Sequence, residues 1–364
     1  MTSLQLNNMK NKILKIASLL IIAIMLVTMF TACTSYDENY EIYDLWVAGV
    51  KVTTRNASDI LGDGTVSYEG DGKTGTLTLN GANITESSYE EAEAFIVSTI
   101  DHLTLNLVGE NKIGMGEKAP VNGISAYDLT IKGEGSLAVG ARASCIKADT
   151  LTVESGKIDT YIKTAEDEIA SFIGVGLWAQ ELLTINSGDI KVHYAPEFTA
   201  LSYGLYCVKD LTINGGSIEI KQEDAAALGV GIISSEKLTI AGGNITVYGN
   251  DDAMNAKTFA MTGGTVNASA VDLFLAGFDP ETGEFVFGSD GVCRLVNKAE
   301  FSGGSLTLTA LERMNPDVPT FFSKDLATHG MKVSGGDSAD TLTEKDTSTY
   351  TYTDTCIRIE KEVN

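Results

Sequence analysis

Leu211-Thr-Ile-Asn-Gly-Gly-Ser-Ile-Glu-Ile220 is one of ten related segments in this chain of 364 residues, and Leu238-Thr-Ile-Ala-Gly-Gly-Asn-Ile-Thr-Val247 is its nearest copy. Each copy alternates apolar and polar residues, turns at glycine and alternates again, which is the pattern of short half-buried strands. Glycine suits the turn because it adopts positive φ without strain. The more divergent copies begin at Leu77, Leu103, Leu129, Leu151, Leu183, Phe259, Ala299 and Met331.

The third residue of the copies recurs at intervals of 22, 32, 28, 27, 21 and 40 residues from Ile131 to Phe301. A third strand precedes most copies, as in Gly176-Leu-Trp-Ala179 and Gly204-Leu-Tyr-Cys207. Repeats of this length that cannot bury an apolar face alone stack on their neighbours. The sequence therefore predicts an all-β solenoid of about ten coils, each with three short strands.

The N-terminal segment has the features of an export signal. Three lysines up to Lys15 precede an uncharged apolar run over residues 16–30, and Thr31-Ala-Cys33 follows. This run is shorter than the ~20 residues that a transmembrane helix needs, and a cysteine at the cleavage point resembles a bacterial lipobox. We expect residues 1–32 to be a lipoprotein signal peptide and Cys33 to be lipidated. The protein would then be lipid-anchored in a bacterial membrane, at the outer membrane or cell surface.

The remaining chain predicts a short tether and one domain. Residues 33–42 are polar and acidic and read as a tether, and residues 43–364 read as the β-helix domain. An uncapped stack of strands exposes an edge that can pair with another chain. We therefore expect residues 43–75 to form an N-terminal cap, residues 337–364 to form a C-terminal cap or edge strand, and the protein to be a monomer.

Charge and cysteine content exclude some partners. The chain has 26 basic and 49 acidic residues, a net charge of −23. Nucleic acid is excluded as a partner because binding its phosphates needs clustered Lys and Arg, and contact with the membrane is expected through the lipid anchor only. Cys145 and Cys293 fall several repeats apart, so we expect buried free thiols rather than disulfides, although an even count of four cysteines after Cys33 permits pairing.

The repeat also carries a family resemblance. Gly-Ile-x-Ala before Leu-Thr-Ile-x-Gly-Gly-x-Ile-x-Val, with the lead-in segments Leu45-Trp-Val-Ala-Gly-Val50 and Asp59–Tyr68, resembles the carbohydrate-binding right-handed parallel β-helix domains of bacterial surface proteins over about Leu45–Gly336. These domains are similar in fold to pectate lyases. The resemblance implies a single-stranded right-handed parallel β-helix that binds polysaccharide, either pectate-like or cellulose-like.

The resemblance further implies a calcium site, because an Asp-Asp-Gly-Ile-like step at a coil corner is associated with calcium in that family. This chain has Asn250-Asp-Asp-Ala-Met254 at one corner. Asp251 and Asp252 can supply carboxylate oxygens to Ca²⁺, and Asn250 and backbone carbonyls can supply the other ligands. The alternative is an acidic corner that is only solvated.

Trp178 and Tyr206 form a candidate carbohydrate-binding pair. They lie 28 residues apart, the same interval that separates Ile185 from Ile213, so they occupy equivalent places on adjacent coils. If both face outward, they form an aromatic strip on which sugar rings can stack. If both face inward, they belong to a core ladder. This alternative is favoured by the isoleucines that are assigned to the same place in other coils: Ile124, Ile146 and Ile233.

The function we expect is non-catalytic polysaccharide binding at the cell surface, assisted by calcium, with no catalytic residues. One alternative is a structural adhesin or spacer that binds a protein partner. Another is a divergent polysaccharide lyase, which would need a basic residue beside bound calcium. Repeat spacing places only Arg294 and Lys257 near Asp251, and neither lies in a recognisable motif.

Overall fold

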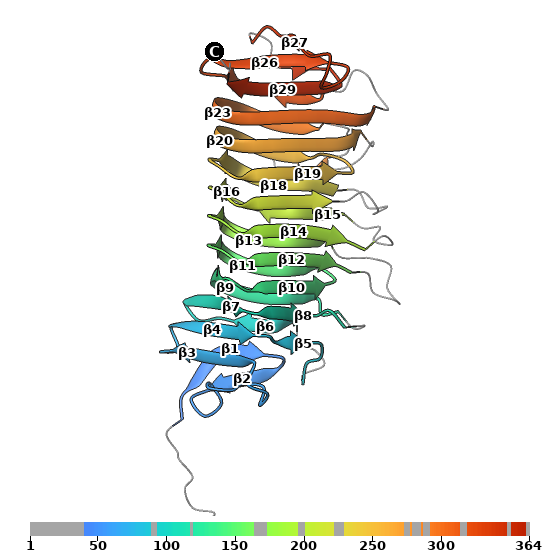
Figure 1. Cartoon of the computed structure of the whole chain (residues 1–364). Coiled ribbons are helices and arrows are strands. Elements are labelled where there is room, and N and C mark those ends of the chain that lie inside the picture. The colour runs from blue at the N-terminus through green and yellow to red at the C-terminus, as the bar shows by residue number, and fades with distance from the viewer. Residues whose placement is uncertain are drawn as a thin grey trace, which may run out of the picture. The chain divides into compact units, whose positions relative to one another are not determined.

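The computed structural model describes residues 40–88, 93–116, 119–163, 173–195, 201–221, 229–272, 277–278, 285–286, 292–313, 319–347 and 351–361. Over these residues the protein is all-β, as the repeats predict, without a helix. Twenty-seven of the described strands join one mixed sheet, in which neighbouring repeats supply neighbouring strands (Figure 1). Ile42–Asn364 forms one compact unit, and residues 1–41 are assigned to another.

Each repeat contributes three strand segments, and each segment pairs in parallel with its counterparts in the adjacent repeats. The leading stack comprises β6 (Ala94–Ser98), β15 (Ser202–Cys207), β24 (Phe321–Ser323) and the first parts of β9 (Asn122–Gly133), β11 (Ser144–Val153), β13 (Gly174–Ile185), β18 (Gly229–Ile240), β20 (Met254–Asp272) and β23 (Cys293–Arg313). The Leu-Thr-Ile stack comprises β4 (Thr74–Asn80), β7 (His102–Val108), β16 (Asp210–Ile213), β25 (Leu326–Ala327) and the following parts of β9, β11, β13, β18, β20 and β23. The post-glycine stack comprises β5 (Asn83–Ile84), β8 (Glu110–Ile113), β10 (Ser136–Ala141), β12 (Lys157–Ile162), β14 (Asp189–Tyr194), β17 (Ser217–Lys221), β19 (Asn244–Gly249) and the last parts of β20 and β23.

Antiparallel strands flank the parallel stacks. The first strands are β1 (Ile42–Val47), β2 (Val50–Thr53) and β3 (Val66–Gly70), which pair antiparallel with β2, β1 and β4 respectively. The last strands are β26 (Met331–Gly336), β27 (Thr343–Glu344), β28 (Thr351–Tyr352) and β29 (Cys356–Lys361). β29 lies between β23 and β26 and is antiparallel to both. A separate antiparallel pair is formed by β21 (Gly277–Phe278) and β22 (Phe285–Val286).

Two of the ten expected copies differ from their prediction. Leu77 pairs with Leu105 and not with Leu103, because β7 has two additional residues before its glycine turn. Met331 begins β26, whose pairings among the described residues are all antiparallel, so this copy adds no parallel repeat. Both copies were matched by residue type alone, and residue type does not fix strand register where the spacing to the glycine changes.

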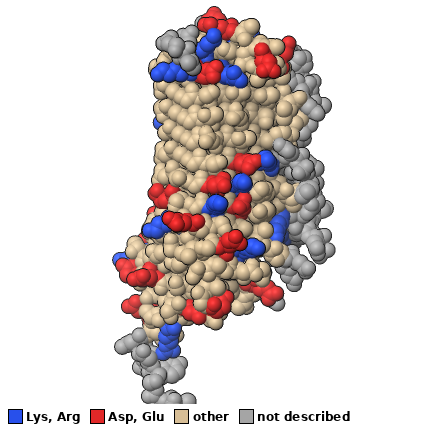
Figure 2. All heavy atoms as spheres, in the orientation of Figure 1, with Lys and Arg blue, Asp and Glu red and all other residues tan. Residues whose placement is uncertain are grey.

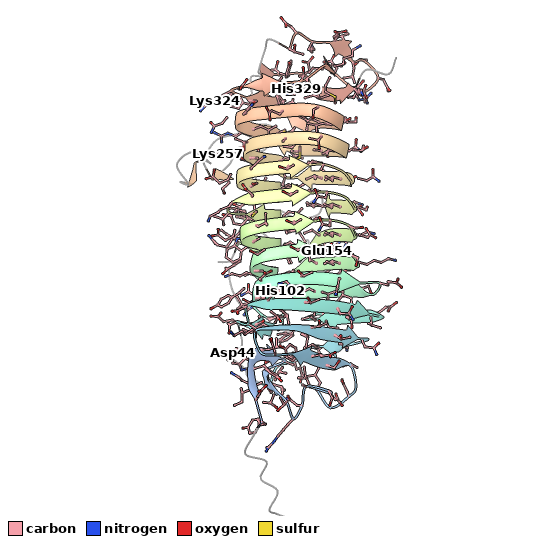
Figure 3. The ribbon with its side chains drawn as sticks, turned by 90° about the vertical axis from the view of Figure 1, so that its left-hand side faces the viewer. Asp44, His102, Glu154, Lys257, Lys324 and His329 are labelled. Atoms are coloured by element: carbon pink, nitrogen blue, oxygen red, sulfur yellow. The ribbon has the colours of Figure 1, made fainter. Side chains whose placement is uncertain are left out.

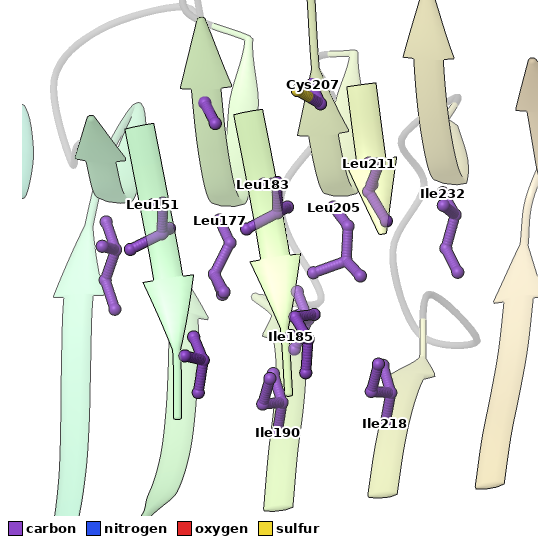
Figure 4. Close-up of a cluster of buried hydrophobic side chains, with 14 of the residues drawn as sticks. Leu151, Leu177, Leu183, Ile185, Ile190, Leu205, Cys207, Leu211, Ile218 and Ile232 are labelled. Atoms are coloured by element: carbon purple, nitrogen blue, oxygen red, sulfur yellow. The ribbon is translucent and has the colours of Figure 1, made fainter. Parts of the chain in front are cut away.

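The apolar positions of the repeat build the core. Leu211, Ile213, Ile218 and Ile220 are 0–1% exposed, and Figure 4 shows equivalent Leu and Ile side chains of successive repeats meeting between the stacks. Full burial of such a side chain contributes about 1.5–3 kcal/mol. An outward threonine next to a core leucine pairs in register through seven repeats: Thr76, Thr104, Thr130, Thr152, Thr184, Thr212 and Thr239.

Polar side chains on the outward faces make contacts between adjacent repeats, and His102 and Glu154 are two of those labelled in Figure 3. His102 Nδ1 lies 3.1 Å from Asp128 Oδ2, and Asn186 Nδ2 donates a hydrogen bond of 2.9 Å to Glu154 Oε1. Solvent-exposed pairs of this kind contribute little to stability, about 0–1 kcal/mol each. Stability of the stack therefore comes mainly from the buried apolar ladders.

Glycine is required where adjacent turns approach closely. Gly216 has φ of +90°, and a Cβ there would lie 2.7 Å from the carbonyl oxygen of Gly188. Gly204, in the leading stack, faces Ile220, and a Cβ on it would lie 2.7 Å from the Ile220 Cδ1 atom. The recurring glycines therefore allow adjacent turns, and strands that face each other across the interior, to approach closely.

The four cysteines of the described residues are buried free thiols, as expected from the sequence. Burial raises the pKa of Cys145 to about 12 and that of Cys207 to about 11. Both thiols therefore stay protonated at neutral pH and behave as small apolar residues.

These thiols predict a loss of stability in alkali. A thiol whose pKa is higher in the folded state favours folding below its unfolded pKa of about 9, and this contribution is lost as the pH rises towards the folded value. Between pH 8 and pH 10 we expect Cys145 alone to account for a loss of roughly 1 kcal/mol. Urea unfolding at both pH values measures the loss, and the Cys145→Ala variant should lose less. An equal loss in that variant would contradict this account.

Candidate functional site

One outward-facing line of residues in the leading stack contains both aromatic residues singled out from the sequence. Trp178 of β13 pairs with Tyr206 of β15. We call this line the outward column, and in order along adjacent strands it comprises Lys147, Trp178, Tyr206, Ile233, Asn255 and Arg294. Leu177 and Leu205, which directly precede Trp178 and Tyr206 in the sequence, belong to the buried core (Figure 4). Because side chains alternate along a strand, Trp178 and Tyr206 face away from that core.

The core-ladder alternative for these aromatics fails on register. Ile146 pairs with Ile124 and with Leu177, and Trp178 pairs with Lys147. The isoleucines Ile124 and Ile146 therefore occupy the position before Trp178, whereas Ile233 pairs with Tyr206, as the sequence predicted. The error arises because these strands carry two apolar residues in succession, which leaves the inward position ambiguous in the sequence.

The two aromatics belong to an apolar cluster outside the main core. Val175, Tyr203, Val230 and Ile233 are buried in it, and Trp178, Leu201 and Tyr206 are partly buried against it. The rings of Tyr203 and Tyr206 have centroids 5.2 Å apart and are tilted by 36°. Trp178 and Tyr206 thus keep part of their rings accessible while their inner edges are fixed by packing.

A cation lies at one end of the aromatic pair. Lys147 Nζ lies 4.1 Å from the centroid of the Trp178 ring, within the range of a cation–π contact.

Burial raises the pKa of Tyr206, and a hydrogen bond with Ser235 partly offsets this rise. Burial also raises the pKa of Tyr203, as do the nearby Tyr206 and Asp251. Both phenols are therefore neutral at physiological pH and can donate a hydrogen bond.

The acidic corner consists of Asn250, Asp251 and Asp252, and it lies beside the apolar cluster. Backbone bonds fix it to β18: Asp251 N donates to Gly229 O at 3.1 Å, and Gly231 N donates to Asp252 O at 3.0 Å. The three residues are only 3–6% exposed. The alternative of a freely solvated acidic corner therefore does not describe these side chains.

Asn255 connects the acidic corner to the outward column. Its Nδ2 donates to Asp252 Oδ2 at 3.3 Å, and the residue is 1% exposed. Among the described residues, its Oδ1 and the hydroxyl oxygen of Tyr203 have no hydrogen-bond partner. Buried polar atoms without partners are unfavourable by about 1–3 kcal/mol each.

The donor set of the corner suits a hard cation. Asp251, Asp252, Asn250 and Asn255 offer carboxylate and amide oxygens, which are the ligands that Ca²⁺ takes. Over the described residues no group of three or more His, Cys, Asp or Glu side chains is placed to hold a metal. A calcium ion here would therefore need amide, backbone or water oxygens besides the two carboxylates.

Several residues of this site were missed in the sequence. Lys147, Tyr203 and Asn255 enter it through strand register, and Asn255 follows Tyr206 by 49 residues across two unequal repeats. Arg294 pairs with Asn255, as repeat spacing suggested, whereas Lys257 forms an ion pair with Glu236 at 3.0 Å. Alignment of the repeats by strand register would have found the first three.

Cys33 and the expected signal peptide, residues 1–32, lie outside the described residues. Within the described part of the chain, no helix is long and apolar enough to cross a membrane.

Comparison with known proteins bears on the same surface. Residues 179–273 match the sequence model of a family described as carbohydrate-binding domain-containing protein. The match supports carbohydrate binding. It includes Tyr206, the acidic corner and Asn255, and it begins one residue after Trp178. No curated protein and no solved structure matches the chain.

Proposed function

We propose that the protein binds polysaccharide through the outward column and does not cleave it. The observation that carries this proposal is the pairing of two outward aromatic rings, Trp178 and Tyr206, beside a segment that matches a carbohydrate-binding family. Sugar rings present apolar C–H faces and polar rims, and they stack on aromatic rings held in this way. The polar members of the column would contact the hydroxyl or carboxylate groups.

Spacing along the column favours a polymeric ligand. Adjacent strands lie about 4.8 Å apart, so the five steps from Lys147 to Arg294 span about 24 Å. A glycan chain lying across the strands would meet Lys147 at one end, then the aromatic pair, and Arg294 at the other end, and it would pass over the buried Ile233 and Asn255. The cations at both ends favour a pectate-like chain at this column. A cellulose-like chain is the other ligand that we propose for the protein.

Binding to a panel of polysaccharides tests the function. We expect the purified protein to be retained by at least one plant-type or bacterial glycan and to release no product from it. No retention by any glycan would favour the alternative of an adhesin or spacer with a protein partner. Release of unsaturated uronides from polygalacturonate in the presence of calcium would establish the lyase alternative.

We further propose that calcium assists binding at the acidic corner. Buried Asp251 and Asp252 would hold the ion, and the unpartnered Asn255 Oδ1 supports an additional ligand beside them. Bound Ca²⁺ would offset the charge of the two carboxylates and fix the end of the outward column. It would also bridge the protein, whose net charge is −23, to an acidic glycan.

Calcium is expected to raise the melting temperature, and Asp252→Asn is expected to abolish the rise. At a free concentration one hundred times its Kd, a ligand stabilises the folded state by about 2.7 kcal/mol. Differential scanning fluorimetry in Ca²⁺ and in EDTA measures the shift. The control is Asp210→Asn, an exposed acid of the Leu-Thr-Ile stack, which should keep the full shift. Equal melting temperatures of the unmodified protein in Ca²⁺ and EDTA would reject the site.

The remaining sequence expectations complete the proposal. The three parallel stacks would close as a right-handed parallel β-helix, and a monomer would be held at the bacterial surface by lipid on Cys33. Parallel register in all three stacks supports the helical winding. Metabolic labelling with a fatty acid tests the anchor, because label that persists in Cys33→Ser would reject it.

A further inference from the structure

A second outward surface lies on the post-glycine stack, away from the outward column. It is formed by three adjacent strand segments, in β19, β20 and β23, and we call it the neutral grid. Its residues are uncharged and polar, and they pair in register as three rows of three: Asn244, Thr265 and Ser305; Thr246, Asn267 and Thr307; Tyr248, Ser269 and Thr309.

These side chains face away from the core. The residues between them along each strand are buried, as shown by Val247, Ala268 and Leu308 at 0–2% exposure. Adjacent strands lie about 4.8 Å apart, and every second residue along a strand lies about 6.8 Å from the last. The grid therefore presents hydroxyl and amide groups at regular intervals over about 10 by 14 Å.

Charged residues border the grid on both sides but do not enter it. On one side β17 places Glu219 beside Thr246, and on the other β29 places Arg358 and Glu360 beside Thr307 and Ser305. Figure 2 shows the corresponding surface as an uncharged area between two bands of acidic and basic residues. In a chain with 75 charged residues among 364, nine adjacent outward positions without charge set this face apart.

We propose that the neutral grid is a second glycan-binding surface, specific for an uncharged polysaccharide chain. Hydroxyl and amide groups both donate and accept hydrogen bonds, as the hydroxyls of a neutral glycan do. The grid has no cation to pair with a uronate, sulfate or phosphate, and the net charge of the protein disfavours a polyanion. The ring of Tyr248 at one corner adds an apolar contact for a sugar face.

The family match covers part of this surface. Its residues 179–273 include the β19 and β20 segments of the grid. The inference rests on the proposed polysaccharide binding and assigns a neutral ligand to a face separate from Trp178 and Tyr206.

The test is retention of the full-length protein by amorphous cellulose, an uncharged glycan, and by immobilised polygalacturonate, a charged one. Thr246→Glu combined with Asn267→Glu places two carboxylates in the grid. We expect this variant to lose at least tenfold in affinity for cellulose. The matched control is Thr212→Glu with Thr239→Glu, an outward pair in register on the Leu-Thr-Ile stack, which should bind cellulose within twofold of the unmodified protein.

The outcomes separate this inference from the proposed function. Retention of the unmodified protein by polygalacturonate alone, or cellulose binding that survives Thr246→Glu with Asn267→Glu, would overturn the grid and leave the outward column intact. No retention by either glycan or by the wider panel would overturn both. Thr246→Ala with Asn267→Ala and Thr307→Ala provides a second variant set without added charge, and it should weaken cellulose binding at an unchanged melting temperature.

Discussion

Replacing Phe301 by alanine is expected to lower the free energy of unfolding by about 3–5 kcal/mol. Phe301 is fully buried, and its ring lies between those of Phe259 and Phe321, with centroid distances of 5.3 and 6.3 Å. Tyr352 continues this row of rings, 5.9 Å from Phe321. Removing the middle ring leaves a cavity and also breaks two aromatic contacts, each worth about 0.5–1.5 kcal/mol beyond area burial.

Urea unfolding with linear extrapolation measures this change. Phe322→Ala is the matched control, because Phe322 is adjacent to Phe321 but only partly buried, and it pairs with Arg294 on the outward side. We expect the control to cost less than half as much. A loss below about 1 kcal/mol for Phe301→Ala would mean that the ring is not enclosed by its neighbours.

Replacing Trp178 and Tyr206 together by alanine is expected to reduce glycan affinity at least tenfold without a large change in folding. Both rings lie outside the main core, so their loss removes part of the separate cluster around Tyr203 and leaves the buried Leu and Ile ladders intact. A tenfold change corresponds to about 1.4 kcal/mol, which is modest for the loss of two stacking rings. Isothermal titration with polygalacturonate, the charged glycan assigned to the outward column, measures the change.

A control on another face distinguishes stacking in the outward column from general aromatic exposure. Tyr161 stacks on His193 across β12 and β14, with ring centroids 4.7 Å apart and an interplanar angle of 16°. Tyr161→Ala therefore removes an outward stacked ring from the post-glycine stack. We expect its affinity to remain within twofold, and equal losses in both variants would remove the assignment of the site to the outward column.

Regularity in the repeats made much of the fold predictable. Thr212 and its counterparts follow an invariant inside-outside alternation, so strand type, outward position and pairing could be read from the chain. The equal spacing of Trp178 and Tyr206 likewise predicted their pairing. Where the interval to the glycine turn changes, as between Leu77 and Leu103, register depends on which backbone groups pair, and residue type alone gave the wrong match.

The candidate site was less predictable than the fold. Asn255 and Tyr203 come from different repeats of unequal length, and only the stacking of strands brings them to Trp178 and the acidic corner. Successive apolar residues such as Leu177 and Trp178 also hid which of the two faces inward. Burial of Asp252 depends on the chain packed around it and has no local signature in the sequence.

Trp178 itself provides the most direct measurement. The chain has two tryptophans, so in a Trp46→Phe variant Trp178 is the only tryptophan that fluoresces. Titration with polygalacturonate, the charged glycan assigned to the outward column, should change its emission and saturate at the concentrations that saturate retention. Bound polygalacturonate that leaves the emission of Trp178 unchanged would contradict binding at the outward column.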